Sequence, residues 1–375
     1  MWYYRSPTIV FGEDSLSFLN SVKSRRCLIV SDRNLEKAGI VDNIKELLPE
    51  DCRTMIFSSI DQEPTFSQMT SAMDSIMKFK PDHIVAVGGG SVIDTAKVIL
   101  FRYARPDLDF YDLTPLEYLG IKEAAKLIAI PTTSGTGSEC SWAAVVSDER
   151  EKRKNELASS EILPDYAILD PAVVTGLPRK QTVSTAVDAM THAIEAYVST
   201  WRNFYSDALA EKALELITGN IAEVLHDPGD IQARNSVHIG ASMAGSSFSN
   251  SQIGLAHALG HALGAIFKVP HGTSVGLFLP AVVEFNSTVV HDRYDRLNSI
   301  FPESMRDKTL AGSLRKIFAT MGQPVHISDA GISKDSYNAA KPSLEKLAME
   351  STGLVANPRE SESADIHMLL EEVMG

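Results

Sequence analysis

A change of pattern near residues 176–181 most constrains how this chain can fold. Before that point, short β-rich runs alternate with helical stretches, and such alternation predicts a parallel sheet covered by helices on both faces. The runs that favour strands are 26–32, 54–60, 82–90, the start of 126–139, and 166–170. The stretches between them that favour helices are 67–79 and 91–100. The first part of the chain is therefore predicted to be a Rossmann-like α/β domain.

After this point the sequence favours helices only. The helical runs are 182–200, 206–226, 232–248, the histidine-rich run after Gly254, 307–322 and 366–375. Gly176 and Pro178 break the chain between the two patterns. A chain of 375 residues also exceeds one ordinary core. We therefore expect an α/β domain over residues 1–178 and an all-helical domain over residues 179–375.

Charge and cysteine content narrow the possible partners and compartment. The formal net charge of -13 argues against nucleic acid or an anionic membrane as the main partner. Three cysteines give no disulfide framework and suit a reducing compartment. No apolar run is expected to reach membrane-spanning length, and the N-terminus lacks the order of a signal peptide. These features predict a soluble, cytoplasmic protein that acts on a small molecule.

Three loops follow predicted strands and could bind a nucleotide. In the first, Gly88, Gly89, Gly90 and Ser91 open a helix, where close backbone approach and free N–H groups attract phosphate. The spacing is not the G-x-G-x-x-G fingerprint, so a tight strand-to-helix turn remains an alternative. Since open α/β sheets bind ligands at the carboxyl ends of their strands, the position of this loop favours a nucleotide.

The other two loops carry an acidic residue and a run of hydroxyls. Asp32 ends what we take as the first strand of the sheet, where a carboxylate can accept hydrogen bonds from an adenosine ribose. It could instead cap the helix that follows. The loop PTTSGTGSE, at 131–139, suits a phosphate or nicotinamide. Its alternative is a helix N-terminus capped by Ser138 or Thr136.

Five potential metal or proton-transfer groups lie in the second part of the chain. They are Asp188, His192, His257, His261 and His271. The first pair and the second pair are each four residues apart, so on a helix each pair shares a face. A lone histidine on an apolar helix is usually a satisfied core residue, but a carboxylate with several imidazoles favours a divalent first-row metal. Pro270 indicates that His271 begins a new element.

The five groups exceed the four protein ligands that such a site would use. One histidine is therefore expected to be free for proton transfer, and the spacing alone does not identify it. A zinc-protease H-E-x-x-H motif is excluded because Ala258 follows His257.

Four ordered motifs resemble those of the iron-containing (group III) alcohol dehydrogenases. They are GGGSVIDTAK, PTTSGTGSE, VDAMTHAIEAY and GLAHALGHALGAIFKVPHG. The resemblance covers nearly the whole chain. It implies a Rossmann-like NAD(P)-binding domain and a helical metal-binding domain, an architecture shared with dehydroquinate synthases.

The resemblance also implies a role for each candidate residue. Asp188, His192, His257 and His271 would be the metal ligands, and His261 would remain unligated beside the nicotinamide. Gly89, Gly90, Ser91 and Asp94 would hold the pyrophosphate, and Thr132, Thr133, Thr136 and Lys154 would contact the cofactor. Asp32 would favour NAD over NADP. Phe248 would lie beside the substrate.

The implied reaction is a reversible hydride transfer between an alcohol or aldehyde held by the metal and the nicotinamide, in the cleft between the domains. Fe²⁺ is the expected metal, Zn²⁺ is possible, and a homodimer is expected. One alternative is a zinc-dependent glycerol, polyol or sugar-phosphate dehydrogenase of the same superfamily. Another is a catalytically silent protein that binds a nucleotide or a metal.

Overall fold

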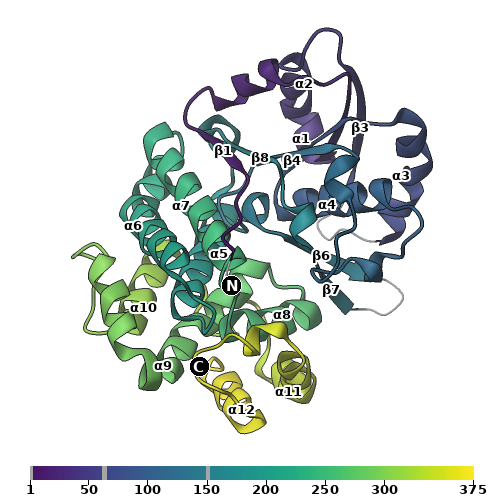
Figure 1. Cartoon of the computed structure of the whole chain (residues 1–375). Coiled ribbons are helices and arrows are strands. Elements are labelled where there is room, and N and C mark those ends of the chain that lie inside the picture. The colour runs from purple at the N-terminus through teal and green to yellow at the C-terminus, as the bar shows by residue number, and fades with distance from the viewer. Residues whose placement is uncertain (1–2, 61–65, 149–152) are drawn as a thin grey trace. The chain divides into compact units, whose positions relative to one another are not determined.

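The structure is a computed structural model that describes residues 3–60, 66–148 and 153–375. These residues divide into two compact units. One unit comprises Arg5–Thr133 and Gly137–Gly176, and the other comprises Leu177–Gly375 with Ser134–Thr136 and the segment up to Tyr4. The first unit is built on a parallel sheet and the second is helical (Figure 1), which confirms the predicted fold class.

In the α/β unit, the described strands of the main sheet lie in the order β1-β8-β5-β4-β2-β3 and are all parallel. Their bounds are β1 Thr8–Phe11, β2 Arg26–Asp32, β3 Arg53–Ile60, β4 His83–Gly88, β5 Lys126–Pro131 and β8 Tyr166–Leu169. The helices of this unit are α1 Arg33–Lys37, α2 Ile40–Glu46, α3 Phe66–Phe79 and α4 Gly90–Ala104. Short 3-10 helices are η1 Ser15–Ser21, η2 Phe110–Asp112, η3 Ile121–Glu123, η4 Ser138–Cys140, η5 Ser160–Ile162 and η6 Pro171–Val174.

Strand alternation explains why this sheet is covered on both faces. Leu28 and Val30 of β2 pack in the cluster formed with α3 and α4, whereas Cys27 and Ile29 pack in the cluster formed with α2 and η1. Successive strand residues point to opposite faces, so a continuous apolar run requires two apolar layers. This is the physical basis of the strand prediction for 26–32, whereas β3 at the edge of the sheet leaves Ile56 exposed.

The order of the strands places a switch point between β2 and β4. From β2 the chain continues to β3 on one side, whereas β4 lies on the other side of β2 and leads on to β5. Ligands of open α/β sheets bind beyond the carboxyl ends of the strands at such a point. Asp32 ends β2, and the glycine loop follows β4.

Several elements of this unit were not predicted. β1 precedes β2, so Asp32 ends the second strand along the chain and not the first. β6 (Ala143–Asp148) and β7 (Arg153–Ala158) form an antiparallel pair apart from the main sheet. The strand pattern missed β1, β6 and β7; β1 is short and β7 is largely polar.

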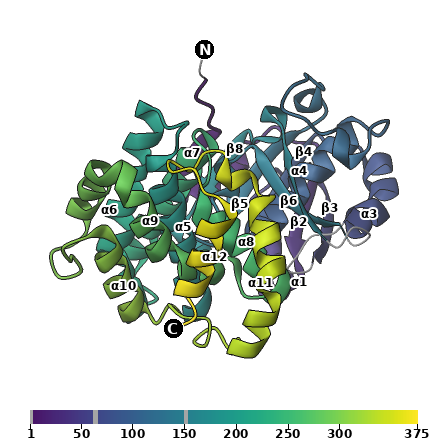
Figure 2. The same ribbon diagram turned by 90° about the horizontal axis from the view of Figure 1, so that it is seen from below.

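The helical unit consists of α-helices and, among its described residues, one short 3-10 helix. Their bounds are α5 Arg179–Val198, α6 Phe204–His226, α7 Ile231–Ser249, α8 Leu255–Phe267, α9 His271–Ile300, α10 Leu310–Met321, α11 Lys334–Met349, η7 Thr352–Leu354 and α12 Ser363–Glu372. The helical predictions after residue 181 match α5, α6, α7, α8, α10 and α12. No helix was predicted for α11, and for α9 only the start of a new element at His271 was expected. α11 and α12 lie side by side at the end of the chain (Figure 2).

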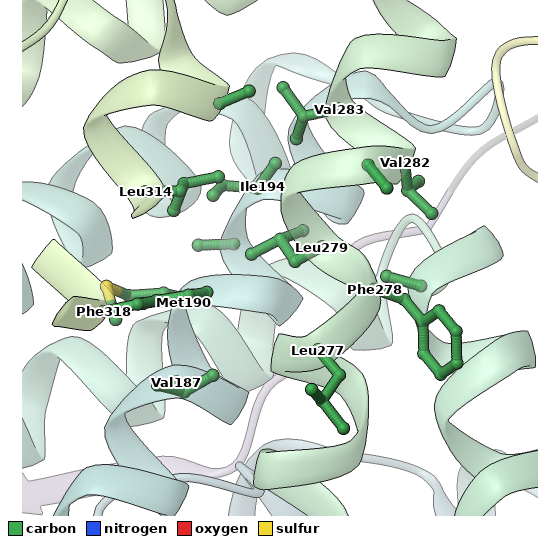
Figure 3. Packing of buried hydrophobic residues seen from close by; sticks show 14 of the residues in the cluster. Val187, Met190, Ile194, Leu277, Phe278, Leu279, Val282, Val283, Leu314 and Phe318 are labelled. Atoms are coloured by element: carbon green, nitrogen blue, oxygen red, sulfur yellow. The ribbon is translucent and has the colours of Figure 1, made fainter. Parts of the chain in front are cut away.

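α5 runs through the middle of this unit. Its residues from Val183 to Val198 are almost all buried, with Thr185 the exception. Figure 3 shows Met190 and Ile194 of α5 close to side chains of α9 and α10 within one apolar cluster. Because one face of α5 is held by this core, the polar side chains on its other face are fixed in position as well.

α9 corrects one sequence-based expectation. By length and mean hydropathy alone, it could cross a membrane, although no run of that kind was expected. In the structure, 72% of its apolar stretch is buried within the protein. Core helices have the same property, and the packing of Leu277, Leu279 and Val283 in the main apolar cluster accounts for it here.

Candidate functional site

The four ligands implied by the resemblance converge in the helical unit. Asp188 and His192 lie one turn apart on α5, His257 lies near the start of α8, and His271 is the first residue of α9. One ligand atom from each lies within 4.8 Å of the others. Oδ1 of Asp188 is 3.2 Å from Nε2 of His271, 3.7 Å from Nε2 of His257 and 3.9 Å from Nε2 of His192.

These spacings fit a first-row metal ion. Ligand atoms bound tetrahedrally at about 2.1 Å lie roughly 3.4 Å from one another, and the three distances from Oδ1 of Asp188 fall on either side of that value. Among the described residues, Asp188 Oδ1 and His257 Nε2 are buried without a hydrogen-bond partner. Buried polar atoms are rarely left without a partner. A bound cation would supply the partner that no neighbouring residue provides, and one carboxylate with three imidazoles suits such an ion.

The N-terminus of α9 is seated against α5, and this places His271. The backbone N–H of Thr273 donates to Oγ of Ser184 at 3.1 Å. A Cβ built on Gly272 would lie 1.8 Å from the carbonyl oxygen of Ser184, so only glycine permits this approach. Pro270 precedes the helix, as expected from the sequence.

The charges in the cluster are strongly coupled. Although burial opposes its charged form, the imidazoles of His192 and His271 hold the pKa of Asp188 well below its usual value. Burial lowers the pKa of His192 to about 3, against the opposing effect of the Asp188 carboxylate. Burial would also lower the pKa of His257, but the carboxylates of Glu195 and Asp188 outweigh it and raise the pKa to about 9. A divalent cation would replace a proton at this position.

His261 and Phe248 lie beside the cluster. The ring of His261 on α8 is 5.0 Å from that of His271 and 5.8 Å from that of His257, between centroids. It is not one of the four converging groups. Phe248, near the end of α7, stacks on His192 with centroids 4.3 Å apart. Both residues are only partly buried, so each can contact a small molecule at the site.

The sequence reasoning missed Glu195. It lies on α5 one turn after His192, and its carboxylate bonds to Nδ1 of His257 at 2.5 Å. The signal was present in VDAMTHAIEAY, because Glu195 is three residues from His192 and seven from Asp188 and therefore shares their helix face.

The glycine loop and the threonine loop meet at one edge of the α/β unit. Gly88 pairs with Pro131 at the ends of β4 and β5, and the N–H of Thr132 donates to the carbonyl of Gly88 at 3.1 Å. Gly89 is the N-cap of α4, with no side-chain cap, and Gly90 and Ser91 form its first turn. A Cβ on Gly89 would be 3.4 Å from Thr133. The start of α4 therefore offers backbone N–H groups next to Thr133.

Asp94 faces the interior of this unit. One carboxylate oxygen accepts from Oγ of Ser138 at 2.5 Å and the other accepts from the N–H of Val145 at 2.9 Å. Nζ of Lys97, which is fully buried, lies 3.6 Å from Asp94 and donates to Ser138. Asp94 thus ties α4 to the loop and to β6. Ser138 is part of this network and Gly137 is the N-cap of η4, so the alternative of a Ser138 or Thr136 cap is wrong.

The remaining cofactor candidates have different settings. Asp32 caps α1, with one oxygen accepting from the N–H groups of Asn34 and Leu35 at 2.8 and 3.1 Å. The alternative that Asp32 caps a helix is thus correct. This cap does not test whether Asp32 also contacts a ribose. Thr136 belongs to the helical unit, although it lies in a loop between strands of the α/β unit. Lys154 lies on β7, but its side chain lies outside the described part of the structure.

Comparison with known proteins decides the family. The model of the iron-containing alcohol dehydrogenase family matches residues 6–171, and the model of the C-terminal part of the Fe-containing alcohol dehydrogenase family matches residues 182–374. The chain belongs to the iron-containing alcohol dehydrogenase family. The resemblance stated from the motifs is confirmed, and so is the expected class of enzyme, an alcohol dehydrogenase.

Individual relatives agree with this family. Aldehyde-alcohol dehydrogenase 2 of Entamoeba histolytica is 35% identical over 298 residues, which make up 76% of this chain and 34% of that protein. The NADPH-dependent butanol dehydrogenase of Clostridium saccharobutylicum is 30% identical over 371 residues, 97% of this chain and 95% of the relative. The chain therefore spans about a third of the first relative and nearly all of the second.

A solved structure supports the same assignment. The iron-containing alcohol dehydrogenase from Thermococcus thioreducens has a TM-score of 0.91 at 29% identity, and the match covers 100% of this chain and 99% of that chain. The alternatives of a glycerol-type dehydrogenase and of a silent binding protein are not favoured, because the matching models are those of the iron-containing alcohol dehydrogenases.

Proposed function

We propose that this protein is an Fe²⁺-dependent alcohol dehydrogenase and aldehyde reductase that uses NAD in preference to NADP. The observation that carries the proposal is the buried oxygen of Asp188 with imidazole nitrogens of three histidines at 3.2–3.9 Å. In this proposal residues 179–375 hold the metal and residues 1–178 bind the cofactor.

Asp188, His192, His257 and His271 would hold the metal. One carboxylate and three imidazoles accept Fe²⁺ or Zn²⁺, and the family favours Fe²⁺. When bound, such an ion acts as a Lewis acid that lowers the pKa of an alcohol or polarises an aldehyde carbonyl. The exposed fraction of the His271 side chain, 38%, against 1–6% for the other three ligands, indicates the side from which a substrate reaches the site.

His261 and Phe248 would act on the substrate side. His261 can exchange a proton with solvent because its ring is partly exposed and lies beside His271. Phe248 covers one face of His192 and so leaves an apolar wall next to the ligands. An apolar wall suits a short primary alcohol, and the butanol named for the Clostridium saccharobutylicum relative is of this kind. The proposed substrates also include diols and lactaldehyde-like compounds.

The cofactor would bind at the switch point of the sheet. Gly89, Gly90 and Ser91 at the start of α4 would hold the pyrophosphate through backbone N–H groups. Thr132, Thr133, Thr136 and Lys154 would contact the rest of the cofactor. Asp94 would support the loop from the interior through Ser138. Asp32 would accept from the ribose and repel a 2′-phosphate, which favours NAD.

The cellular setting is also part of the proposal. The net charge and the sparse cysteines favour a cytoplasmic protein with a small-molecule substrate. A homodimer is proposed from the family resemblance and can be tested by light scattering of the purified protein.

Metal analysis coupled to a cofactor assay tests the proposed function. Protein purified without oxygen is analysed for iron and zinc, and is then reconstituted with each metal separately. NADH and NADPH oxidation is measured with short aldehydes, and the reverse reaction with alcohols and glycerol. We expect one ion per chain, faster turnover with iron and with NADH, and little activity on glycerol. Protein that binds neither metal, or that reduces no aldehyde when loaded, would overturn the proposal.

A further inference from the structure

Glu195 is a buried carboxylate with an unusual set of donors. Its side chain is only 4% exposed. One oxygen accepts from the backbone N–H of Ala256 at 2.6 Å and of His257 at 3.3 Å. The other accepts from the N–H of Gly254 at 2.9 Å and bonds to Nδ1 of His257 at 2.5 Å. Both oxygens are therefore occupied by α8, and Glu195 is not one of the four groups that converge as ligands.

The backbone bonds make Glu195 the cap of α8. Gly254 is the N-cap residue of this helix and offers no side-chain cap. The first N–H groups of a helix need acceptors, and a carboxylate there also interacts favourably with the helix dipole. Glu195 supplies that acceptor from α5, so the start of α8 is held against the helix that carries Asp188 and His192.

The bond to the ring sets which nitrogen of His257 can act as a ligand. An ionised carboxylate only accepts hydrogen bonds, so Nδ1 carries a proton whenever this bond is made. The lone pair of the neutral ring is then on Nε2. This atom is buried, has no hydrogen-bond partner in the described structure, and lies 3.7 Å from Oδ1 of Asp188.

We infer that Glu195 is a positioning residue of the metal centre, which fixes the tautomer and direction of His257 so that Nε2 faces the metal position. The inference rests on the metal site of the proposed function. Ligating histidines generally donate their other ring N–H to a carboxylate or carbonyl, and removal of such partners weakens metal binding. Here the same carboxylate also anchors the helix that carries the ligand.

The variant Glu195→Gln tests this role. If the amide oxygen accepts from the N–H groups of Ala256 and His257, the amide NH₂ faces Nδ1 of His257 and Gly254. It would then donate to Nδ1 and move the ring proton to Nε2, where it blocks the lone pair. We expect metal affinity to fall by about 10- to 100-fold, measured by competition with a chromophoric chelator for Zn²⁺ and Fe²⁺ on folded protein.

A second helix-cap variant separates positioning from stability. Asp230 caps α7 by accepting from the N–H groups of Gln232 and Ala233. Asp230→Ala should lower the melting temperature of the metal-free protein and leave metal affinity unchanged. If Glu195→Gln behaves in the same way, Glu195 is only a cap and the inference is wrong.

The tautomer of His257 can be measured directly in the wild-type protein. Long-range ¹H–¹⁵N correlation spectra of metal-free protein labelled at histidine are recorded at a pH at which the ring of His257 is neutral and are assigned with His257→Asn. They should show the proton of His257 on Nδ1 in the wild type. A neutral ring with its proton only on Nε2 would overturn the inference even if Glu195→Gln does not fold. Wild-type protein that binds no metal would instead overturn the proposed function, and the inference with it.

Discussion

Nε2 of His271 lies 3.2 Å from Oδ1 of Asp188, although one residue begins α9 and the other lies in the middle of α5. The contact depends on the close approach of the two helices at Gly272 and Ser184. The N–H of Thr273 bonds to Oγ of Ser184 in the same place. The close backbone contact between α5 and the start of α9 therefore controls the distance between the side chains of Asp188 and His271.

Gly272→Ala should disturb this pair without changing a ligand. The added Cβ would meet a backbone oxygen at 1.8 Å, so the start of α9 must move away from α5. We expect a loss of about 2 kcal/mol in unfolding free energy and weaker metal binding, measured by urea unfolding and chelator competition. Gly219→Ala, at an exposed position of α6, has open space around the new Cβ and should stabilise by up to about 1 kcal/mol. Equal metal affinity in both variants would contradict the prediction.

Removing a ligand should remove the metal. His257→Ala deletes one imidazole and leaves Asp188 and Glu195 without their shared partner. We expect folded protein with less than about a tenth of the wild-type metal content, because loss of one of four protein ligands greatly weakens the binding of a first-row metal. His291→Ala, at an exposed histidine of α9, is the matched control and should keep its metal. Wild-type metal content in the His257 variant would refute this ligand assignment.

His261→Ala should separate proton transfer from metal binding. Its ring lies 5.0 Å from His271 but outside the converging group. We expect normal metal content with kcat lowered by about 10²-fold and an altered pH profile, as for loss of a general acid or base. Metal analysis and initial rates at several pH values measure both effects. Loss of the metal from this variant would show that His261 is a ligand.

His238 should make the helical unit less stable in acid. It is buried on α7, with Nδ1 3.0 Å from Oγ of Ser134, and burial lowers its pKa to about 4. An unfolded histidine has a pKa near 6.5, so between these values the unfolded state binds more protons. Stability is then full above the unfolded pKa and falls as the pH drops through this window, by up to about 3 kcal/mol.

The variant His238→Gln isolates this effect. Glutamine keeps a polar group near Ser134 but does not titrate. Urea unfolding of metal-free wild type and variant is compared at pH 7.5 and pH 5, so that the ligand histidines contribute equally to both. The loss of stability between the two pH values should be smaller in the variant. An equal loss in both proteins would rule out His238 as the source.

Local pattern predicted most of the elements. The strands β2, β3 and β8 were recognised from short apolar runs, and in β2 that run fills two faces of a covered sheet. α5 and α8 were recognised because pairs four residues apart share a helix face. The pattern failed for β1 and β7, where four residues or a polar composition left no clear alternation.

Side-chain partners across elements were harder to predict. The sequence did not reveal that both oxygens of Asp94 bond inside the unit to Ser138 and Val145. Its contact with the pyrophosphate stays a prediction. Glu195 was not singled out, because nothing in its own helix reveals that α8 begins opposite it. Such partners depend on where a second element lies, and periodicity along one segment does not contain that information.

The sequence by itself determined the two structural classes, the helix faces of Asp188 and His192 and of His257 and His261, and the family. Only the tertiary structure decided which of the five candidates converge and that a sixth group, Glu195, holds His257. The physical reason is that spacing fixes directions within one helix, whereas distances between helices depend on close contacts such as Gly272 against Ser184.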